Sequence, residues 1–270
     1  MMLEELFGVK GKTALVTGGG TGIGLMIATA LVAGGAKVFI CSRKEAVVKG
    51  AAEQIASLGH PGSVEAFVGD VGSKEGVDDL VAQLRSRTDT LDILVNNAGI
   101  TWGAPLTEFP FDAWQKVLDV NVSGLMYLTQ SLFGELAASG KPEDPARVIN
   151  IGSLMGTAPM GDGAYSYAAS KAAVHHMTRI LAKELAARHI TVNAFAPGPF
   201  QSKMTAFATG SDELAQKVGQ NVPLGRIGQA SDIQGATLFL CGKAGAYTTG
   251  AILPLDGGLH VETASNIFAH

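Results

Sequence analysis

Short apolar runs alternate with segments of helical period along the whole chain. In the first half, apolar runs predict strands at 13–17, 37–41 and 64–69, with helices between them from about Gly22 and across 44–58. The pattern continues with helices across 74–87, about 112–138 and about 164–188, and with strands at 92–97, 147–152, 190–196 and 251–257. The strands are nearly continuous Val, Ile and Leu runs, which is typical of parallel strands covered on both faces. The pattern predicts an α/β fold with a doubly wound, mainly parallel sheet of about seven strands and helices on both faces.

The division into domains follows from the same pattern. The 270 residues suit one α/β domain, and no linker, low-complexity tract or repeat interrupts the alternation. We therefore expect one domain over 1–270. The segment 199–230 lies between the sixth and last expected strands and is longer than one crossover helix requires, with a helical middle at 212–218. We predict that it forms a substrate lid.

Charge and composition argue against several classes of protein. The net charge is −4 and no basic run is present, so a nucleic-acid partner is not expected. Cys41 and Cys241 are far apart and show no CxxC or Cys/His spacing, which argues against a disulfide framework and a zinc site, and no metal is expected. No apolar stretch is long enough to span a bilayer, and the first residues lack the positive charge of a secretory signal. We expect a cytoplasmic protein without a membrane anchor.

A glycine-rich loop follows the first expected strand and runs directly into a helix. In such a loop Gly18 permits the tight turn, Gly22 lets the backbone approach a pyrophosphate, and Gly24 lets the helix pack closely on the strand. The N-terminus of the helix then faces the anion. A glycine cluster alone could be a flexible turn, but the order strand, loop, helix is the context that a dinucleotide site requires. We predict a Rossmann-type nucleotide site that includes Gly18, Thr21, Gly22, Ile23 and Gly24.

The end of the second expected strand distinguishes NADP(H) from NAD(H). An Asp or Glu there would accept a hydrogen bond from the ribose 2′-hydroxyl of NAD, whereas this chain has Ser42 and Arg43. Arg43 can pair with a 2′-phosphate, although it could also simply solvate the next helix. We expect NADP(H). Asp70 and Val71, and Asn97, Ala98 and Gly99, end the next two strands, where ligands of such sheets collect, although either group could equally be satisfied turn residues.

Three side chains carry the candidate chemistry. Tyr167 and Lys171 are four residues apart in a helical segment and share one face. A nearby ammonium favours phenolate, so we expect Lys171 to lower the pKa of Tyr167, and the pair can then act as a general acid or base. Ser153 follows the fifth expected strand and would donate a hydrogen bond to a substrate carbonyl.

Other polar residues near this set compete for the same roles. Tyr165 lies off the face of Lys171, six residues away, and is the weaker candidate for the proton donor. We expect His175 and His176 to be packing or surface residues, because no base–nucleophile–orienter set includes them.

With these residues the chain resembles the single-domain short-chain dehydrogenases/reductases over nearly its whole length. The matching elements are TGGGTGIG (17–24), NNAG (96–99), Asn121 in DVNVSG, Ser153, YAASK (167–171) and PG (197–198). The resemblance implies a catalytic tetrad of Asn121, Ser153, Tyr167 and Lys171, in which Asn121 positions a water and Lys171 binds the nicotinamide ribose. It also implies contacts of the nicotinamide with Pro197, Gly198, Phe200 and Ser202, where Ser202 replaces a Thr common in the family. A homotetramer or homodimer is implied as well.

At closer range the chain is similar to NADPH-dependent β-ketoacyl reductases of rhamnolipid synthesis and their fungal relatives. We therefore expect reduction of a ketone or β-ketoacyl-type carbonyl by hydride transfer, with Tyr167 as proton donor. The predicted substrate pocket is apolar and consists of Leu154, Met155, Met160 and Met204, with Phe200 and Phe207 beside it. Two alternatives remain: an alcohol or sugar dehydrogenase working in the oxidative direction, and a non-catalytic regulator that senses NADP(H).

Overall fold

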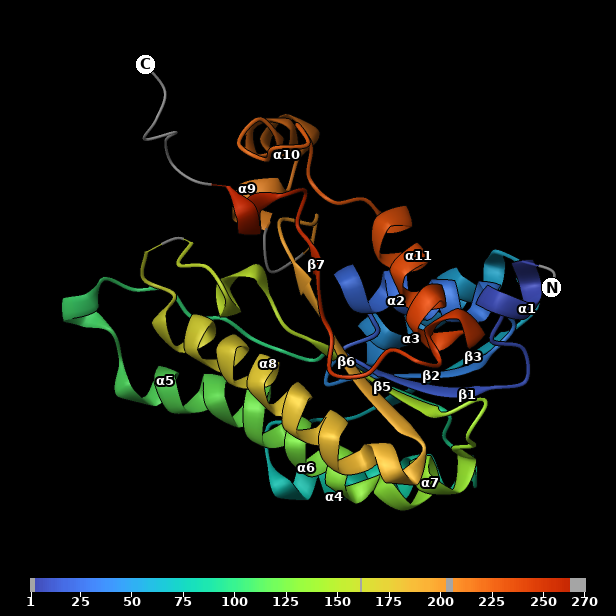
Figure 1. Cartoon of the computed structure of the whole chain (residues 1–270). Helices are drawn as coiled ribbons and strands as arrows, with labels where there is room; N and C mark the ends of the chain where they lie inside the picture. The colour runs from blue at the N-terminus through green and yellow to red at the C-terminus, as the bar shows by residue number, and fades with distance from the viewer. Residues whose placement is uncertain (1–2, 161, 203–205, 263–270) are drawn as a thin grey trace.

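The fold is built on one parallel sheet, seen in a computed structural model that describes residues 3–160, 162–202 and 206–262 (Figure 1). The strands have the order β3-β2-β1-β4-β5-β6-β7, and every neighbouring pair is parallel. Their bounds are β1 Thr13–Thr17, β2 Lys37–Ser42, β3 Ser63–Val68, β4 Ile93–Asn96, β5 Ala146–Ile151, β6 Ile190–Pro197 and β7 Ile252–Leu255. Each lies within two residues of its predicted range, so the predicted doubly wound sheet is confirmed.

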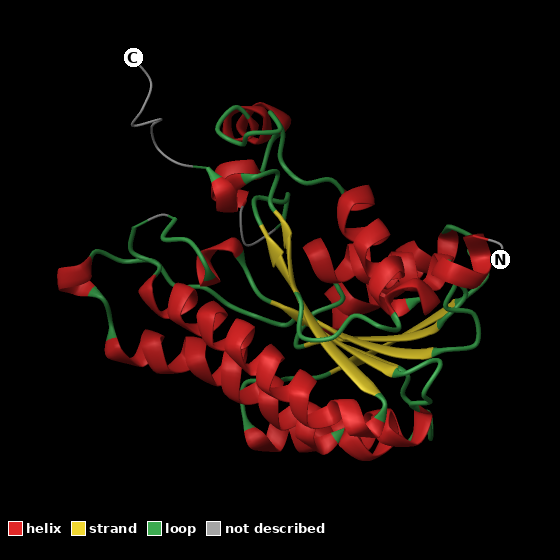
Figure 2. Ribbon diagram, viewed as in Figure 1, coloured by secondary structure: helices red, strands yellow, loops and turns green. Residues whose placement is uncertain are grey.

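Two layers of helices enclose the sheet, as Figure 2 shows. One layer contains α2 (Gly22–Ala33), α3 (Glu45–Ser57) and α11 (Ala230–Cys241). The other contains α4 (Lys74–Arg85), α5 (Phe111–Leu118), α6 (Leu125–Ser131), α7 (Phe133–Ser139) and α8 (Tyr165–Leu185). Three short helices lie outside these layers: α1 (Leu3–Phe7), α9 (Ala206–Thr209) and α10 (Asp212–Gly219). Each layer buries a separate apolar core against the sheet, which explains why the strands are apolar on both faces.

The long helix predicted across 112–138 is wrong in one respect, because it is interrupted twice. The residues Asp119–Gly124 form a π-helical segment between α5 and α6, and Leu132 leaves helical geometry between α6 and α7. A π turn accommodates one more residue than an α turn and often occurs at functional sites. Here it contains Asn121.

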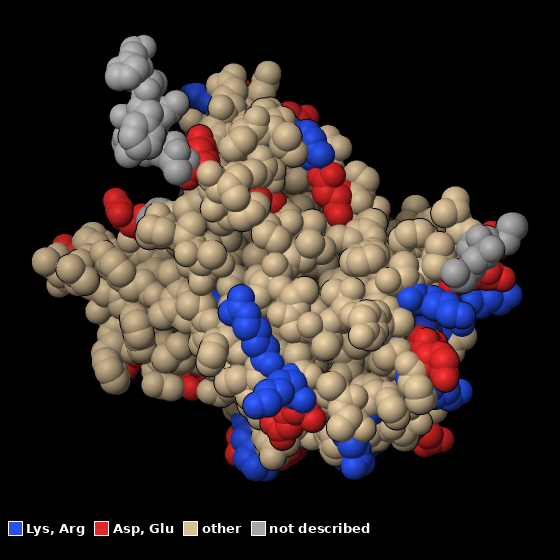
Figure 3. Space-filling model, viewed as in Figure 1, with Lys and Arg blue, Asp and Glu red and all other residues tan. Residues whose placement is uncertain are grey.

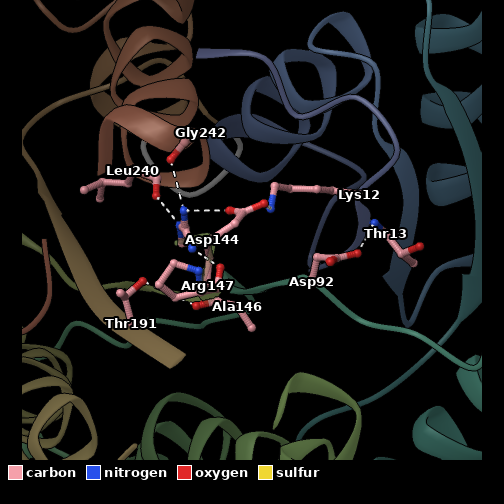
Figure 4. Close-up of polar contacts among 10 residues, drawn as sticks. Lys12, Thr13, Asp92, Asp144, Ala146, Arg147, Thr191, Leu240 and Gly242 are labelled. Carbon is pink, nitrogen blue, oxygen red and sulfur yellow. Dashed lines mark hydrogen bonds and ion pairs between the residues drawn. The ribbon is translucent and has the colours of Figure 1, made fainter. Parts of the chain in front are cut away.

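The amino-terminal edge of the sheet is fixed by a buried arginine (Figure 4). Arg147 at the start of β5 is fully buried and donates to the carbonyl oxygens of Leu240 and Gly242 at the end of α11, and to that of Pro145. Its guanidinium also pairs with Asp144, which in turn binds Lys12. The candidate site residues collect at the opposite, carboxyl edge, where ligands of such sheets bind.

Candidate active site

The glycine loop connects β1 to α2 and is held by the end of β4. Gly18 has φ +64°, a left-handed conformation that favours glycine. The Asn97 side chain donates to the carbonyl oxygens of Thr17 and Gly18, at 2.8 and 3.1 Å. A Cβ on Gly24 would lie 2.4 Å from Asn97 Nδ2 and 2.5 Å from Gly18 O. Gly24 therefore permits the close packing that the sequence predicts. Asn97 is not an ordinary turn residue, because its side chain binds the backbone of the glycine loop.

The N-terminus of α2 faces outward from this loop without a competing anion. Thr21 precedes the helix and makes no side-chain cap, and the first turn, which includes Ile23, has no acidic residue. The helix N–H groups and the helix dipole can therefore interact with a bound phosphate. Ser202 lies above the loop, since a Cβ on Gly22 would be 3.0 Å from Ser202 Cβ. The structure thus brings a predicted nicotinamide neighbour and the glycine loop together.

A cavity of about 350 Å³ lies beside the ends of β2 and β3. It is lined by Arg43 and Asp70, by Gly72 and Ser73 directly before α4, and by residues of α5 and the π segment. Arg43 is exposed and forms no ion pair with any residue that the structure describes. The small side chain of Ser42 leaves room beside Arg43, and its hydroxyl donates to the Lys44 carbonyl. The cavity combines a free guanidinium with space for an adenosine-sized group.

Asp70 and Val71 do not have the same surroundings. One carboxylate oxygen of Asp70 accepts from Gly72 N at 2.9 Å, and this hydrogen bond closes the turn at residues 70–72. The residue still lines the cavity. Val71 is buried and belongs to the core beneath the cavity.

The three candidate catalytic side chains converge beyond the end of β5. Ser153 follows β5 and is buried, and its hydroxyl accepts from Met155 N. Lys171 is also buried, donates from Nζ to Ile151 O at 2.7 Å, and lies 5.5 Å from the centre of the Tyr167 ring. The helix α8 presents Tyr167 and Lys171 on one face, as their spacing predicts. The arrangement places a phenol, an ammonium and a hydroxyl around one point.

The pKa shifts of these groups correct one expectation. The prediction that Lys171 lowers the pKa of Tyr167 is wrong: burial raises that pKa, and hydrogen bonding with Ser153 offsets this only in part. Burial also lowers the pKa of Lys171 to about 8. Removing either group from water disfavours its charged form. The phenol is therefore protonated at neutral pH and suited to donate a proton.

Asn121 is held inward by the π segment. Its Oδ1 accepts from Ile100 N at 2.9 Å, and its Nδ2 donates to Ile100 O at 3.0 Å and to Ser170 Oγ at 2.9 Å. A Cβ on Gly99 would lie 3.2 Å from Asn121 Oδ1 and 3.6 Å from Lys171 Nζ. The two polar atoms thus face the same space, which glycine leaves open. Asn121 and Lys171 can share a water there.

The residues predicted to contact nicotinamide and substrate are more dispersed. Pro197 ends β6, and Gly198 N donates to Leu255 O. The Phe200 ring is buried, packs on Gly228 and lines a separate cavity of about 310 Å³. Leu154 is buried after Ser153, whereas Met155 and Met160 are half-buried. Met204 and the side chain of Phe207 lie outside the described residues.

Comparisons with known proteins give the family. The model described as Enoyl-(Acyl carrier protein) reductase matches residues 18–260. The rhamnolipids biosynthesis 3-oxoacyl-[acyl-carrier-protein] reductase of Pseudomonas aeruginosa is 43% identical, with 96% of this chain and 100% of that protein covered. The chain belongs to the short-chain dehydrogenases/reductases.

Further relatives of this short-chain dehydrogenase/reductase include a solved complex with NADP and a sugar-alcohol dehydrogenase. The Pseudomonas aeruginosa RhlG/NADP active-site complex superposes with a TM-score of 0.90 at 42% identity, covering 95% of this chain and 99% of that one. The galactitol 2-dehydrogenase (L-tagatose-forming) of Cereibacter sphaeroides is 36% identical over 97% of this chain and 100% of that protein. The short-chain dehydrogenase/reductase described here is an oxidoreductase, as the sequence predicts.

Some residues of this family member have surroundings that sequence reasoning missed. Thr17 Oγ1 accepts from the backbone N–H groups of Asn97 and Ala98 and so joins β1 to β4 at the site. His176 is exposed, as expected, but the buried His175 contacts the backbone of Ser153, and its position four residues after Lys171 could have indicated this. The competitor Tyr165 is partly exposed and packs against Phe109, with ring centres 5.6 Å apart.

Two further observations concern metal ligands and membrane spans. Within residues 3–160, 162–202 and 206–262, no group of three or more His, Cys, Asp or Glu side chains could hold a metal ion. No helix in these ranges has both the length and the apolar character needed to cross a membrane.

Proposed function

We propose that the protein is an NADPH-dependent reductase that converts a ketone or β-ketoacyl-type carbonyl to the alcohol. The observation that carries this proposal is the convergence of Ser153, Tyr167 and Lys171 beside the glycine loop. The name of the relative from Pseudomonas aeruginosa, a 3-oxoacyl reductase, supports the same reaction class and substrate class.

NADP(H) fits the residues on the cofactor side. The N-terminus of α2 receives the pyrophosphate, and the free guanidinium of Arg43 receives the 2′-phosphate beside Ser42. Asp70 accepts from the adenine amino group through the oxygen that does not bind Gly72. When bound, NADPH supplies the hydride that reduces the carbonyl carbon.

The proton comes from Tyr167. Its raised pKa keeps the hydroxyl protonated, so it can donate to the developing alkoxide. Ser153 donates a hydrogen bond to the same oxygen and stabilises the charge that develops there. Lys171 binds the nicotinamide ribose, and a water between Lys171 and Asn121 returns the proton from solvent. The opening at Gly99 leaves space for that water.

The substrate side is apolar and consists of Leu154, Met155 and Met160, which follow the catalytic serine in the chain. Flexible methionine side chains suit substrates of varied shape. The segment 199–230, which contains α9 and α10, acts as a lid over this side of the single domain. Pro197, Gly198 and Ser202 at its start contact the nicotinamide.

The protein assembles as a homotetramer or homodimer through the layer that contains α5 and α8. Large apolar side chains are exposed there, with Phe111 81% and Ile180 50% exposed. Figure 3 shows few charged side chains over α5 and the first part of α8. An apolar surface of this kind is typical of a protein interface.

The two cysteines are free and buried, in keeping with the reducing conditions of the cytoplasm.

The test is oxidation of NADPH with a panel of carbonyl compounds that includes acetoacetyl-CoA and a cyclic diketone. Tyr167→Phe should lower kcat by roughly 10²–10⁴-fold while NADPH still binds. Galactitol with NADP⁺ tests the oxidative direction, and faster turnover there would favour a dehydrogenase. No turnover with any carbonyl would overturn the proposal, and near-wild-type turnover in Tyr167→Phe would transfer the donor role to Tyr165.

A further inference from the structure

A buried histidine lies directly behind the catalytic serine. His175 is on α8, one turn beyond Lys171, and only 4% of its surface is exposed. Its Nε2 lies 3.4 Å from the backbone nitrogen of Ser153, and its Nδ1 lies 3.3 Å from Thr157 Oγ1. Neither contact belongs to the reaction described above. The imidazole therefore connects α8 to both ends of the short segment that carries Ser153.

The partners of the ring determine where its proton lies. A backbone N–H can only donate, so Nε2 must accept from Ser153 and carry no hydrogen. The neutral ring then carries its proton on Nδ1 and donates it to Thr157 Oγ1. Burial, together with the positive charges of Arg179 and Lys171, lowers the pKa of His175 to about 4. At neutral pH the ring therefore keeps the tautomer that holds both contacts.

Two glycines around Ser153 make space for this ring. A Cβ on Gly152 would lie 2.2 Å from His175 Nε2, and a Cβ on Gly156 would lie 2.8 Å from His175 Cε1. The segment 152–157 thus wraps around the imidazole, and within it Ser153 is extended with φ −168° and ψ 154°. This backbone conformation sets where the Ser153 hydroxyl points.

We propose that His175 is a positioning residue: by accepting the Ser153 N–H it fixes the backbone of the serine, and so keeps the serine hydroxyl directed at Tyr167 and the substrate carbonyl. The inference rests on the proposed function for the role of Ser153 as a hydrogen-bond donor. His175 touches neither substrate nor cofactor in this role and acts only through Ser153. Its loss should therefore affect turnover rather than cofactor binding.

Kinetics of matched variants test this role. His175→Leu removes the acceptor and keeps an apolar side chain, whereas His175→Gln keeps an acceptor near the position of Nε2. With NADPH and acetoacetyl-CoA, we expect His175→Leu to lower kcat at least tenfold and to leave the Kd for NADPH within twofold. We expect His175→Gln to recover most of this loss. The control His176→Leu alters the exposed neighbour and should match the wild type.

A double-mutant cycle separates positioning from general stability. If His175 acts through Ser153, His175→Leu should cause little further loss of kcat in a Ser153→Ala background. An equal loss in both backgrounds would overturn the inference, as would wild-type kcat in His175→Leu.

The tautomer provides a readout that needs no activity and no folded variant. In wild-type protein with ¹⁵N-labelled histidine, NMR at neutral pH should show the buried imidazole protonated at Nδ1 and unprotonated at Nε2. The opposite tautomer would overturn the inference even if the variants failed to fold. If the tautomer is as expected but the wild type reduces no carbonyl, the proposed function fails while the contact between His175 and Ser153 stands.

Discussion

Replacing Arg147 with methionine should destabilise the protein without affecting its site. The guanidinium donates to Leu240 O at 3.0 Å, to Gly242 O at 3.1 Å and to Pro145 O, all of which are buried contacts (Figure 4). The first two carbonyls lie at the C-terminal end of α11, where helix carbonyls lack partners within the helix. Methionine fills much of the volume but cannot donate a hydrogen bond. The carbonyl oxygens of Leu240 and Pro145 then lose their donor, whereas Gly242 O still accepts from Gly245 N at 3.3 Å.

The magnitude follows from these contacts. A buried carbonyl without a partner costs ~1–3 kcal/mol, so two could cost ~2–6 kcal/mol. Part of this is recovered, because burial lowers the pKa of Arg147, which shows that its charge is costly to bury. Asp144 is 46% exposed and keeps its ion pair with Lys12 at 2.6 Å, so it is not left as an isolated buried charge. We expect a net loss of ~2–4 kcal/mol in the free energy of unfolding.

Urea unfolding measures this loss, with Lys49→Met as the control. Lys49 also pairs with a carboxylate, Glu45, but both side chains are 62% exposed, so its removal should change the stability little. Turnover of the folded Arg147→Met protein at 25 °C should equal that of the wild type, because Arg147 lies at the amino edge of the sheet. A loss of stability no larger than that of the control would refute this account of the arginine.

Three further changes test the site. Arg43→Ala should raise the KM for NADPH at least tenfold, as expected from losing a contact of roughly 1.5–3 kcal/mol. The KM for NADH should not change. If the wild type used NADPH and NADH equally well, the assignment of NADPH would be wrong. Gly24→Ala should weaken NADPH binding in a fluorescence titration, because its Cβ would lie 2.5 Å from Gly18 O, whereas Gly50→Ala, which meets nothing within 4 Å, should bind normally. The kcat/KM for NADPH should fall as pH rises through about 8, where the buried Lys171 loses its charge, and a profile that stays level to pH 9.5 would rule this out.

The sheet could be predicted because its signal is local. Buried parallel strands are apolar throughout, and each of the predicted runs became a strand of the sheet. The break in the helix after residue 118 could not be predicted in this way. A π turn adds one residue to a pattern that otherwise continues with helical period, and its stability comes from distant contacts of Asn121 with Ile100 and Ser170.

The candidate site was predictable to the extent that strand ends specify it. Ser153, Asn97 and Asp70 each follow a strand, and the carboxyl ends of parallel strands meet at one edge. The pKa of Tyr167 was not predictable, because desolvation depends on how deeply the tertiary structure buries the ring. The contact between His175 and Ser153 was missed because it joins a helix to the end of a strand 22 residues away.

Several polar side chains of the site are hydrogen-bonded to main-chain atoms, and these bonds make the site rigid around the reacting groups. Asn97 is fixed to the backbone of Thr17, Asn121 to that of Ile100, and Lys171 to that of Ile151. Each anchor is a main-chain atom within a few residues of the carboxyl end of β1, β4 or β5, and these strands are neighbours in the sheet. The sheet therefore sets the distances between the groups before a substrate arrives, and little reorganisation is needed during the reaction. We therefore expect that substitutions in the proposed substrate residues Leu154 and Met155 change substrate preference more than they change proton transfer.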